Sequence, residues 1–296
     1  MLNGFLNINK PKGITSFDVI RMVRRIKFGE KIGHTGTLDP LASGVLVLVF
    51  GEATKLIEFI VKADKEYEAQ ITLGAASVTY DAEGEIKKIS EKRPLKREVE
   101  DGLRVFKGDI FQTPPKFSAI KVKGKKAYEL ARKGIEVNLK KRKIHIYSIK
   151  ILKYEYPNLK IKVMCSSGTY IRSLAHEIGL KLQTGAYLSG LKRTRSGGFL
   201  IKNAVSPEDL NTQNLKQKLE PVEKYVKLFP KIILNSIEYK KLNFGQTISR
   251  PKLKEGIDLF MGFYKNSLAG ILEKVKDSGS KDSQNLLKYY KKLNID

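Results

Sequence analysis

The chain has 296 residues, 41% of them hydrophobic and 29% charged, which are the proportions of a globular protein large enough to bury a core. Its 56 lysine and arginine residues outnumber 31 acidic ones, and the formal charge of +25 indicates a polyanionic partner, unless it serves only to keep the surface solvated. The longest apolar stretch, residues 45–50, is too short to span a bilayer, and the N-terminus lacks the apolar run of a signal peptide. We therefore expect a cytoplasmic protein that does not enter a membrane.

The sequence also lacks the patterns that bind metals and nucleotide cofactors. Cys165 is the only cysteine, which excludes an internal disulfide and a cysteine-rich zinc site. His34, His145 and His176 do not have the close spacing of metal ligands, and no phosphate-binding glycine motif occurs. We expect no metal and no cofactor, so that any chemistry must come from side chains alone.

The first third of the chain predicts strands and helices without regular βαβ alternation. Strands are expected at residues 5–9, 45–50 and 67–73, the last with the alternating pattern of a half-buried strand. A helix capped by Thr15 or Ser16 is expected to run to about residue 28. Its predicted apolar stripe comprises Phe17, Ile20 and Val23, and the side chains off that stripe are Arg21, Arg24 and Arg25.

The remainder of the chain continues this mixture. The expected elements are an exposed helix at 91–106, a short hairpin and helix within 112–137, strands at 143–154 and 159–165, and a helix that begins at Thr169 or Tyr170. Residues 206–230 have the polar composition of a linker, and a compact strand-rich unit follows, ending in a polar tail or a terminal helix. We predict an α+β fold with a mainly antiparallel sheet.

The loop GHTGTLDPLASGVL is the segment that most resembles a reactive site on physical grounds. Its glycines permit tight turns and close approach of a ligand to the backbone. Pro40 restricts Asp39 to an extended conformation, just before the strand at 45–50. A carboxylate is thereby held on a stiff support, although an aspartate before proline also commonly caps a turn.

Together with other segments in the same order, this loop resembles the TruB family of pseudouridine synthases. The similar segments are KPKGITS, HTGTLDPLASGVL, KEYEAQITLG, TYDAEGEI, PPKFSAIKVKGKKAYELARKGIEV, SSGTYIRSLAHEIG and TGAYLSGLKR. The resemblance implies a pseudouridine synthase fold, with a mainly antiparallel mixed sheet flanked by helices. It implies a catalytic domain at 1–228 with an RNA-clamping insertion at about 112–143, and a small β-rich PUA-like RNA-binding domain with a C-terminal tail at 229–296.

The resemblance also assigns roles to individual residues. Asp39 is the expected catalytic residue, and the expected active-site support comprises Tyr67, Tyr170, Arg172 and Leu191. Arg172 is the expected cation that opposes the rise in the pKa of Asp39 caused by burial. The expected RNA-binding residues are His34, Lys121, Lys123, Lys125, Lys126 and Arg132. Residues 121–153 contain twelve basic residues and two acidic ones, as expected of a segment that contacts phosphates.

The activity implied is the isomerisation of uridine-55 in the T loop of tRNA to pseudouridine. The enzyme would flip the base out, break the glycosidic bond with the help of the aspartate and rejoin it at another atom. Two alternatives remain, which are an RNA-guided synthase of the dyskerin-like branch and a non-catalytic protein that binds or folds tRNA. We expect tRNA as the partner, no obligate protein partner, and a monomer.

Overall fold

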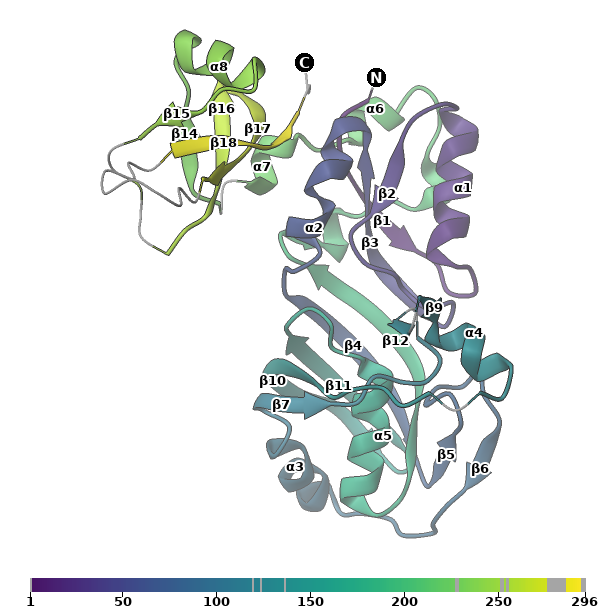
Figure 1. The fold of residues 1–296 in the computed structure, drawn as a ribbon. Helices are drawn as coiled ribbons and strands as arrows, with labels where there is room; N and C mark the ends of the chain where they lie inside the picture. The colour runs from purple at the N-terminus through teal and green to yellow at the C-terminus, as the bar shows by residue number, and fades with distance from the viewer. Residues whose placement is uncertain are drawn as a thin grey trace.

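The structure is a computed structural model that describes residues 2–118, 120–122, 124–135, 137–226, 229–250, 253, 256–275 and 286–293. The side chains of Lys121, Lys126 and Arg132 are outside this description. Figure 1 shows a large elongated body built on one sheet and a smaller β-rich unit beside its upper end. The predicted α+β class is confirmed.

The large body is organised around a nine-stranded sheet. Its main path is β1 (Gly4–Lys10), β3 (Ala42–Phe50), β12 (Ala186–Ser196), β4 (Lys65–Leu73), β11 (Asn158–Cys165), β10 (Arg142–Glu155) and β7 (Gly108–Gln112), with β2 (Ile32–His34) beside β3 and β13 (Phe199–Leu200) beside β12. All pairs are antiparallel except β12 and β3, which run parallel. The predicted mainly antiparallel sheet is therefore confirmed.

Helices and short ribbons lie around this sheet, and the last helix of the chain belongs to the smaller unit. The helices are α1 (Ser16–Ile26), α2 (Ile57–Ile60), α3 (Lys96–Arg104), α4 (Ala127–Arg132), α5 (Ile171–Leu182), α6 (Leu215–Lys218), α7 (Val222–Val226) and α8 (Ser236–Asn243), with short 3-10 helices at Gly51–Leu56, Ile201–Asn203 and Pro207–Asp209. Two-stranded ribbons join β5 (Ala75–Ser77) to β6 (Ile86–Lys88) and β8 (Lys121–Val122) to β9 (Lys125–Lys126). The helix predicted at 91–106 is shorter than expected.

Helix α1 begins with a capping box, in which Thr15 and Asp18 each accept a hydrogen bond from the other's backbone N–H. Its buried residues are Ser16, Val19, Ile20 and Val23, whose spacing of three and four places them on one face. Phe17 is not among them, and 53% of its surface is exposed. The prediction that Phe17 lies on the buried stripe is wrong, because Val19, and not Phe17, packs into the core with Ile20 and Val23.

Strand β12 was not predicted, although it lies in the middle of the sheet between β3 and β4. Its register against β4 shifts between Leu188 and Gly190 and again between Arg193 and Arg195. Each bulge moves the following side chains to the opposite face and interrupts the alternation by which a strand is found in a sequence.

A second sheet forms the smaller unit. Its order is β14 (Lys231–Ile233), β16 (Leu259–Tyr264), β17 (Ser267–Lys274), β18 (Leu286–Lys292) and β15 (Ile248–Ser249). Strand β18 replaces the predicted tail or terminal helix, because the fully buried Leu287 anchors it to this sheet. The segment predicted as a linker also packs against the protein, and Leu215, Val222 and Val226 are buried in it.

One apolar cluster joins the two units. Met261, Phe263 and Leu293 of the smaller unit are buried together with Val45 and Val47 of β3. The outward face of β3 is thus covered, which explains why its apolar run is buried on both sides. The other face of β3 belongs to the main core of the large body.

Candidate active site

A cavity of about 840 Å³ opens in the large body, and Asp39 is one of its lining residues. The loop that carries Asp39 is fixed to the start of α1 and to the turn before it. The Ser16 hydroxyl accepts a hydrogen bond from the Leu38 N–H at 2.8 Å and donates one to the Leu38 carbonyl at 3.0 Å. The Gly13 N–H donates to the Pro40 carbonyl at 2.8 Å. The carboxylate is therefore held on a rigid support, with 40% of its side chain exposed.

Arg172 connects Asp39 to a second carboxylate. Its Nε lies 3.1 Å from Asp39 Oδ2, and its Nη1 lies 3.0 Å from Asp81 Oδ2. Its Nη2 donates to the Phe117 carbonyl at 3.0 Å. The arginine side chain is only 9% exposed, and that of Asp81 only 1%. Each branch of the guanidinium thus has its own acceptor, which fixes the direction in which Nε points at Asp39.

Asp81 is itself held by the turn around it. Its Oδ1 accepts hydrogen bonds from the Thr79 hydroxyl at 2.6 Å and from the Glu83 N–H at 3.0 Å. Tyr80 adopts φ = 64°, a left-handed conformation that costs free energy for a residue of its size. Asp81 is therefore an anchor for the arginine.

The charge state of Asp39 reflects two opposed effects. Burial against the cavity wall raises the pKa of Asp39, because it removes water from the charged form, and Asp81 acts in the same direction. The Arg172 guanidinium opposes the rise, with smaller contributions from Lys10 and Arg193. The balance leaves the pKa above its ordinary value.

Apolar and aromatic side chains complete the cavity. Tyr67 of β4 and Leu191 of β12 lie in its wall, and Tyr170 stands at the start of α5. Gln112 fixes that start, because its side chain accepts from the Tyr170 N–H at 2.8 Å and donates to the Tyr170 carbonyl at 3.1 Å. A flat, uncharged ring would fit such walls, and the partly exposed Asp39 carboxylate would face that ring.

Comparisons with known proteins agree with this geometry. Residues 24–171 match the model of the TruB family pseudouridylate synthase N-terminal domain, and residues 172–228 match that of the tRNA pseudouridylate synthase B C-terminal domain. The chain belongs to the TruB family of pseudouridylate synthases. It is 42% identical over 280 residues to tRNA pseudouridine synthase B of Clostridium tetani, covering 93% of this chain and 97% of that protein. It is 45% identical over 256 residues to the protein of the same name from Clostridium acetobutylicum, covering 86% and 89%.

Two solved structures are also similar to this chain over nearly its whole length. One chain of a Cbf5–Nop10–Gar1 complex is 27% identical, with a TM-score of 0.75, over 98% of this chain and 84% of that chain. A chain of an H/ACA RNP bound to a substrate RNA containing 2′-deoxyuridine is 25% identical, with a TM-score of 0.73, over 98% and 85%. The identities are lower than those to the two clostridial proteins.

The structure brings together the TruB-like residues predicted for the active site. Asp39, Tyr67, Tyr170, Arg172 and Leu191 all line the one cavity, although they come from four separate parts of the chain. This proximity supports their predicted roles without testing them. Burial raises the pKa of Tyr67, so that its hydroxyl stays protonated at neutral pH.

The predicted RNA-binding residues are placed less closely. His34 ends β2 outside the set of cavity-lining residues, and its Nδ1 accepts from the Gly36 N–H at 3.3 Å. Burial lowers the pKa of His34, which favours the neutral ring. Lys125 is exposed on the β8–β9 ribbon, where Lys121 pairs with Lys126. Lys123 lies outside the described residues.

Three buried cations near the cavity were missed from the sequence. Arg193 is 3% exposed, and it donates to the Val45 carbonyl at 2.7 Å and the Gly36 carbonyl at 2.9 Å. Lys10 donates to the Ile14 carbonyl at 2.6 Å, and burial lowers the pKa of Lys10 to about 8. Burial likewise lowers the pKa of Lys65 to about 8. Arg193 could have been found in the sequence only by predicting strand β12, and the bulges of that strand interrupt the alternating pattern.

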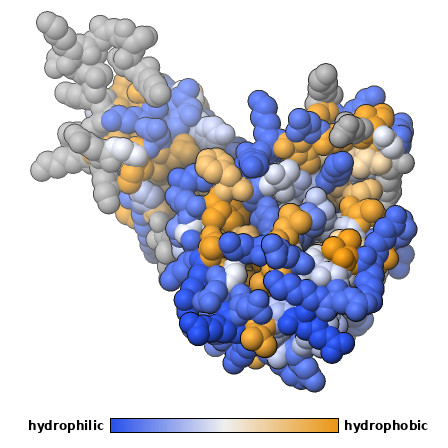
Figure 2. All heavy atoms as spheres, turned by 90° about the horizontal axis from the view of Figure 1, so that it is seen from below, coloured by the Kyte–Doolittle hydropathy of each residue, from blue (hydrophilic) through white to orange (hydrophobic). Residues whose placement is uncertain are grey.

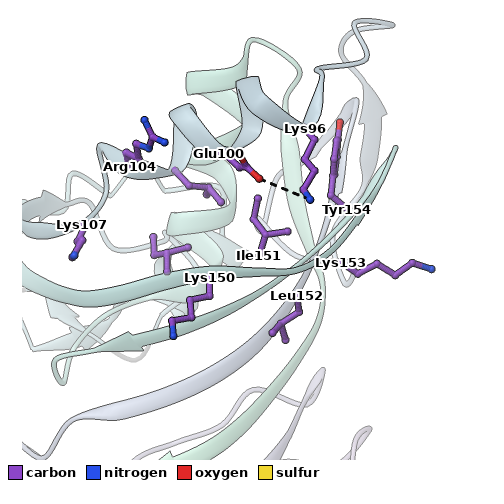
Figure 3. Close-up of a pocket in the computed structure, with 11 residues that line it drawn as sticks. Lys96, Glu100, Arg104, Lys107, Lys150, Ile151, Leu152, Lys153 and Tyr154 are labelled. Atoms are coloured by element: carbon purple, nitrogen blue, oxygen red, sulfur yellow. Dashed lines mark ion pairs between the residues drawn. The ribbon is translucent and has the colours of Figure 1, made fainter.

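A second hollow of about 530 Å³ lies between α3 and β10 (Figure 3). Ile151 points toward α3, whereas Lys150 and Leu152 point to the opposite side of the strand. Glu100 is the one carboxylate in its lining, and it pairs with Lys96 at 4.0 Å. The hollow between α3 and β10 therefore has none of the arrangement around Asp39.

Figure 2 shows the molecule from below, where hydrophilic side chains predominate.

The described residues contain no group of three or more His, Cys, Asp or Glu side chains suited to a metal ion. No helix in the described part of the chain is long and apolar enough to span a membrane.

Proposed function

We propose that this protein isomerises uridine-55 in the T loop of tRNA to pseudouridine, with Asp39 as the catalytic residue. The observation that carries the proposal is the pair formed by Asp39 and the buried Arg172, at 3.1 Å, on the wall of a cavity that can admit a nucleobase. The clostridial proteins similar to this chain are named for this class of reaction.

The reaction needs only what the cavity offers. The bond between N1 of uracil and C1′ of ribose breaks, and the base rotates. C5 then bonds to C1′, C5 loses its proton, and N1 gains one. No group enters or leaves, and no electron is transferred. Asp39 can attack C1′ or C6, or remove a proton from the sugar, and each route begins from the ionised carboxylate. Arg172 favours that ionised form and orients it.

The cavity walls would hold the flipped base. Tyr67 offers a ring for stacking, and Leu191 an apolar surface against the opposite edge. Extrusion of a base costs a few kcal/mol, which these contacts must offset. Tyr170 would position the start of α5, and with it Arg172.

The insertion at 112–143 would act as a clamp on the T stem-loop. The Phe117 carbonyl accepts from Arg172, so the insertion already contacts the arginine that is paired with Asp39. Lys121, Lys123, Lys125, Lys126 and Arg132 would contact phosphates. Residues 229–296 would form the PUA-like unit, and residues 1–228 the catalytic domain. The protein would act as a cytoplasmic monomer without an obligate protein partner.

The two alternatives, an RNA-guided synthase and a non-catalytic tRNA-binding protein, are tested by assaying the purified protein for modification of tRNA. An RNA-guided synthase would need a guide, but the identities of 42% and 45% to tRNA pseudouridine synthase B, against 27% to a chain of the Cbf5–Nop10–Gar1 complex, favour a stand-alone enzyme. Incubation with an unmodified tRNA transcript alone should yield pseudouridine at position 55. Asp39→Asn should bind the transcript without modifying it. Modification only with a guide RNA, or an active Asn variant, would contradict the proposal.

The clamp has a test of its own. Replacing Lys121, Lys123, Lys125 and Lys126 together with glutamine should weaken tRNA binding and flatten its salt dependence, because fewer counterions are released. An unchanged salt slope would rule out phosphate contacts by these lysines.

A further inference from the structure

Two phenylalanines that the core does not use lie on α1 and just after its end. Phe17 is 53% exposed, and Phe28, just beyond the end of the helix, is 95% exposed. An aromatic side chain so fully in water gains nothing from folding, because burial of apolar area is the source of its stabilising effect. Among the large hydrophobic side chains of the described residues, that of Phe28 is the most exposed.

Cations lie between and beside these rings. Arg21, Arg24, Arg25 and Lys27 are all exposed. Arg21 pairs with Asp18 at 2.5 Å and stands 5.4 Å from the centre of the Phe17 ring. Within the described part of the chain, no carboxylate lies within ion-pairing distance of the other three. Phe17, Arg21 and Arg24 follow one another at spacings of four and three residues, which places them along one face of the helix.

The start of α1 lies next to the loop that carries Asp39. The Ser16 hydroxyl at the start of α1 is hydrogen-bonded in both directions to Leu38, the residue before Asp39. The eleven residues of α1 extend about 16 Å from that point. An RNA held in the cavity can therefore reach along the helix.

We propose that Phe17, Arg21, Arg24, Arg25, Lys27 and Phe28 form a second RNA-contact surface, which binds the nucleotides next to the flipped uridine. The inference rests on the proposed function. Arg24, Arg25 and Lys27 contact the phosphates, and Phe28 stacks on an unpaired base. Interleaved cations and exposed aromatic rings are the usual composition of a surface that binds single-stranded nucleic acid. A protein partner fits less well, because a cluster of unpaired cations requires a matching acidic surface.

Two variants separate the phosphate contacts from the stacking contact. Arg24→Gln with Arg25→Gln should reduce the slope of log affinity against log salt by about 1.4 to 1.8, for two lost phosphate contacts. Phe28→Ala should weaken binding of an unmodified tRNA transcript by roughly 5- to 150-fold with an unchanged slope, as expected when one stacked base is lost. All these side chains are exposed, so that folding should be preserved.

The controls are Lys216→Gln with Lys218→Gln on α6 and Phe111→Ala, whose ring is 68% exposed on β7. Affinity is measured by filter binding at several salt concentrations, and the single-turnover rate at saturating tRNA. The α1 variants should lose affinity but keep the saturating rate, while the controls bind like the wild type. Wild-type tRNA affinity and salt slope in both the Arg24/Arg25 variant and the Phe28 variant would overturn the proposal. Normal tRNA binding and modification by these variants, together with binding of an acidic protein to this surface, would also overturn it. A wild-type chain that binds tRNA without modifying it would instead refute the proposed function.

Discussion

Arg172→Lys tests the central arrangement of the site, because lysine keeps the charge and loses the branched geometry. The guanidinium serves three acceptors at 3.0 to 3.1 Å, on Asp39, Asp81 and Phe117. A lysine ammonium can reach one carboxylate well, and the buried Asp81 will compete for it with Asp39. A charged hydrogen bond contributes about 1.5 to 3 kcal/mol, so loss of the Asp39 contact should slow the reaction by roughly 10- to 150-fold. The pKa of Asp39 should rise at the same time, because its main opposing cation moves away.

The assay is single-turnover formation of pseudouridine at saturating tRNA, measured across pH. The rate of the lysine variant should fall, and the acid limb of its pH profile should move to higher pH, while tRNA affinity changes little. Arg104→Lys, on the exposed side of α3, is the matched control and should behave as wild type. A lysine variant within threefold of the wild-type rate, with an unmoved acid limb, would refute the role given to Arg172.

Three further predictions concern single residues. Asp39→Asn should abolish activity and also stabilise the fold at pH 7, because burial raises the pKa of Asp39 and the ionised carboxylate is therefore unfavourable in the folded state. In urea unfolding, the gain in the free energy of unfolding should shrink as the pH falls through the folded pKa, where the wild-type carboxyl becomes protonated. A gain that stays constant with pH would contradict this linkage. Tyr67→Phe keeps the ring and loses only the hydroxyl, so it should keep tRNA affinity with a rate loss of about tenfold or less, and a complete loss in the same single-turnover assay would assign the hydroxyl to the chemistry. Gly44→Ala would put a methyl group 2.2 Å from the Arg193 carbonyl at φ = +100°, so thermal unfolding should show a fall in stability of several kcal/mol, and an unchanged melting temperature would show that β3 and β12 can separate there.

The sequence predicted the α+β class, the strands at 4–10, 65–73, 142–155 and 158–165 to within a few residues, and the loop of Asp39. These features are local, since a strand of alternating residues or an aspartate between glycine turns and a proline depends on its immediate neighbours. Resemblance to a family supplied Arg172, Tyr67 and Leu191, which no local pattern distinguishes from ordinary core residues.

The tertiary structure decided what surrounds the carboxylate. The bulged strand β12 enters the sheet between β3 and β4, which brings Leu191 and Arg193 to the cavity from far along the chain. Helix α5 carries Arg172 to a point between Asp39 and Asp81, and the core turns Phe17 outward. Such contacts depend on which strands pair and which face of a helix is buried, and a sequence read in local windows does not contain that information. The sequence by itself therefore determined where a reactive carboxylate lies in the chain, and the tertiary structure determined which charged and aromatic side chains surround it.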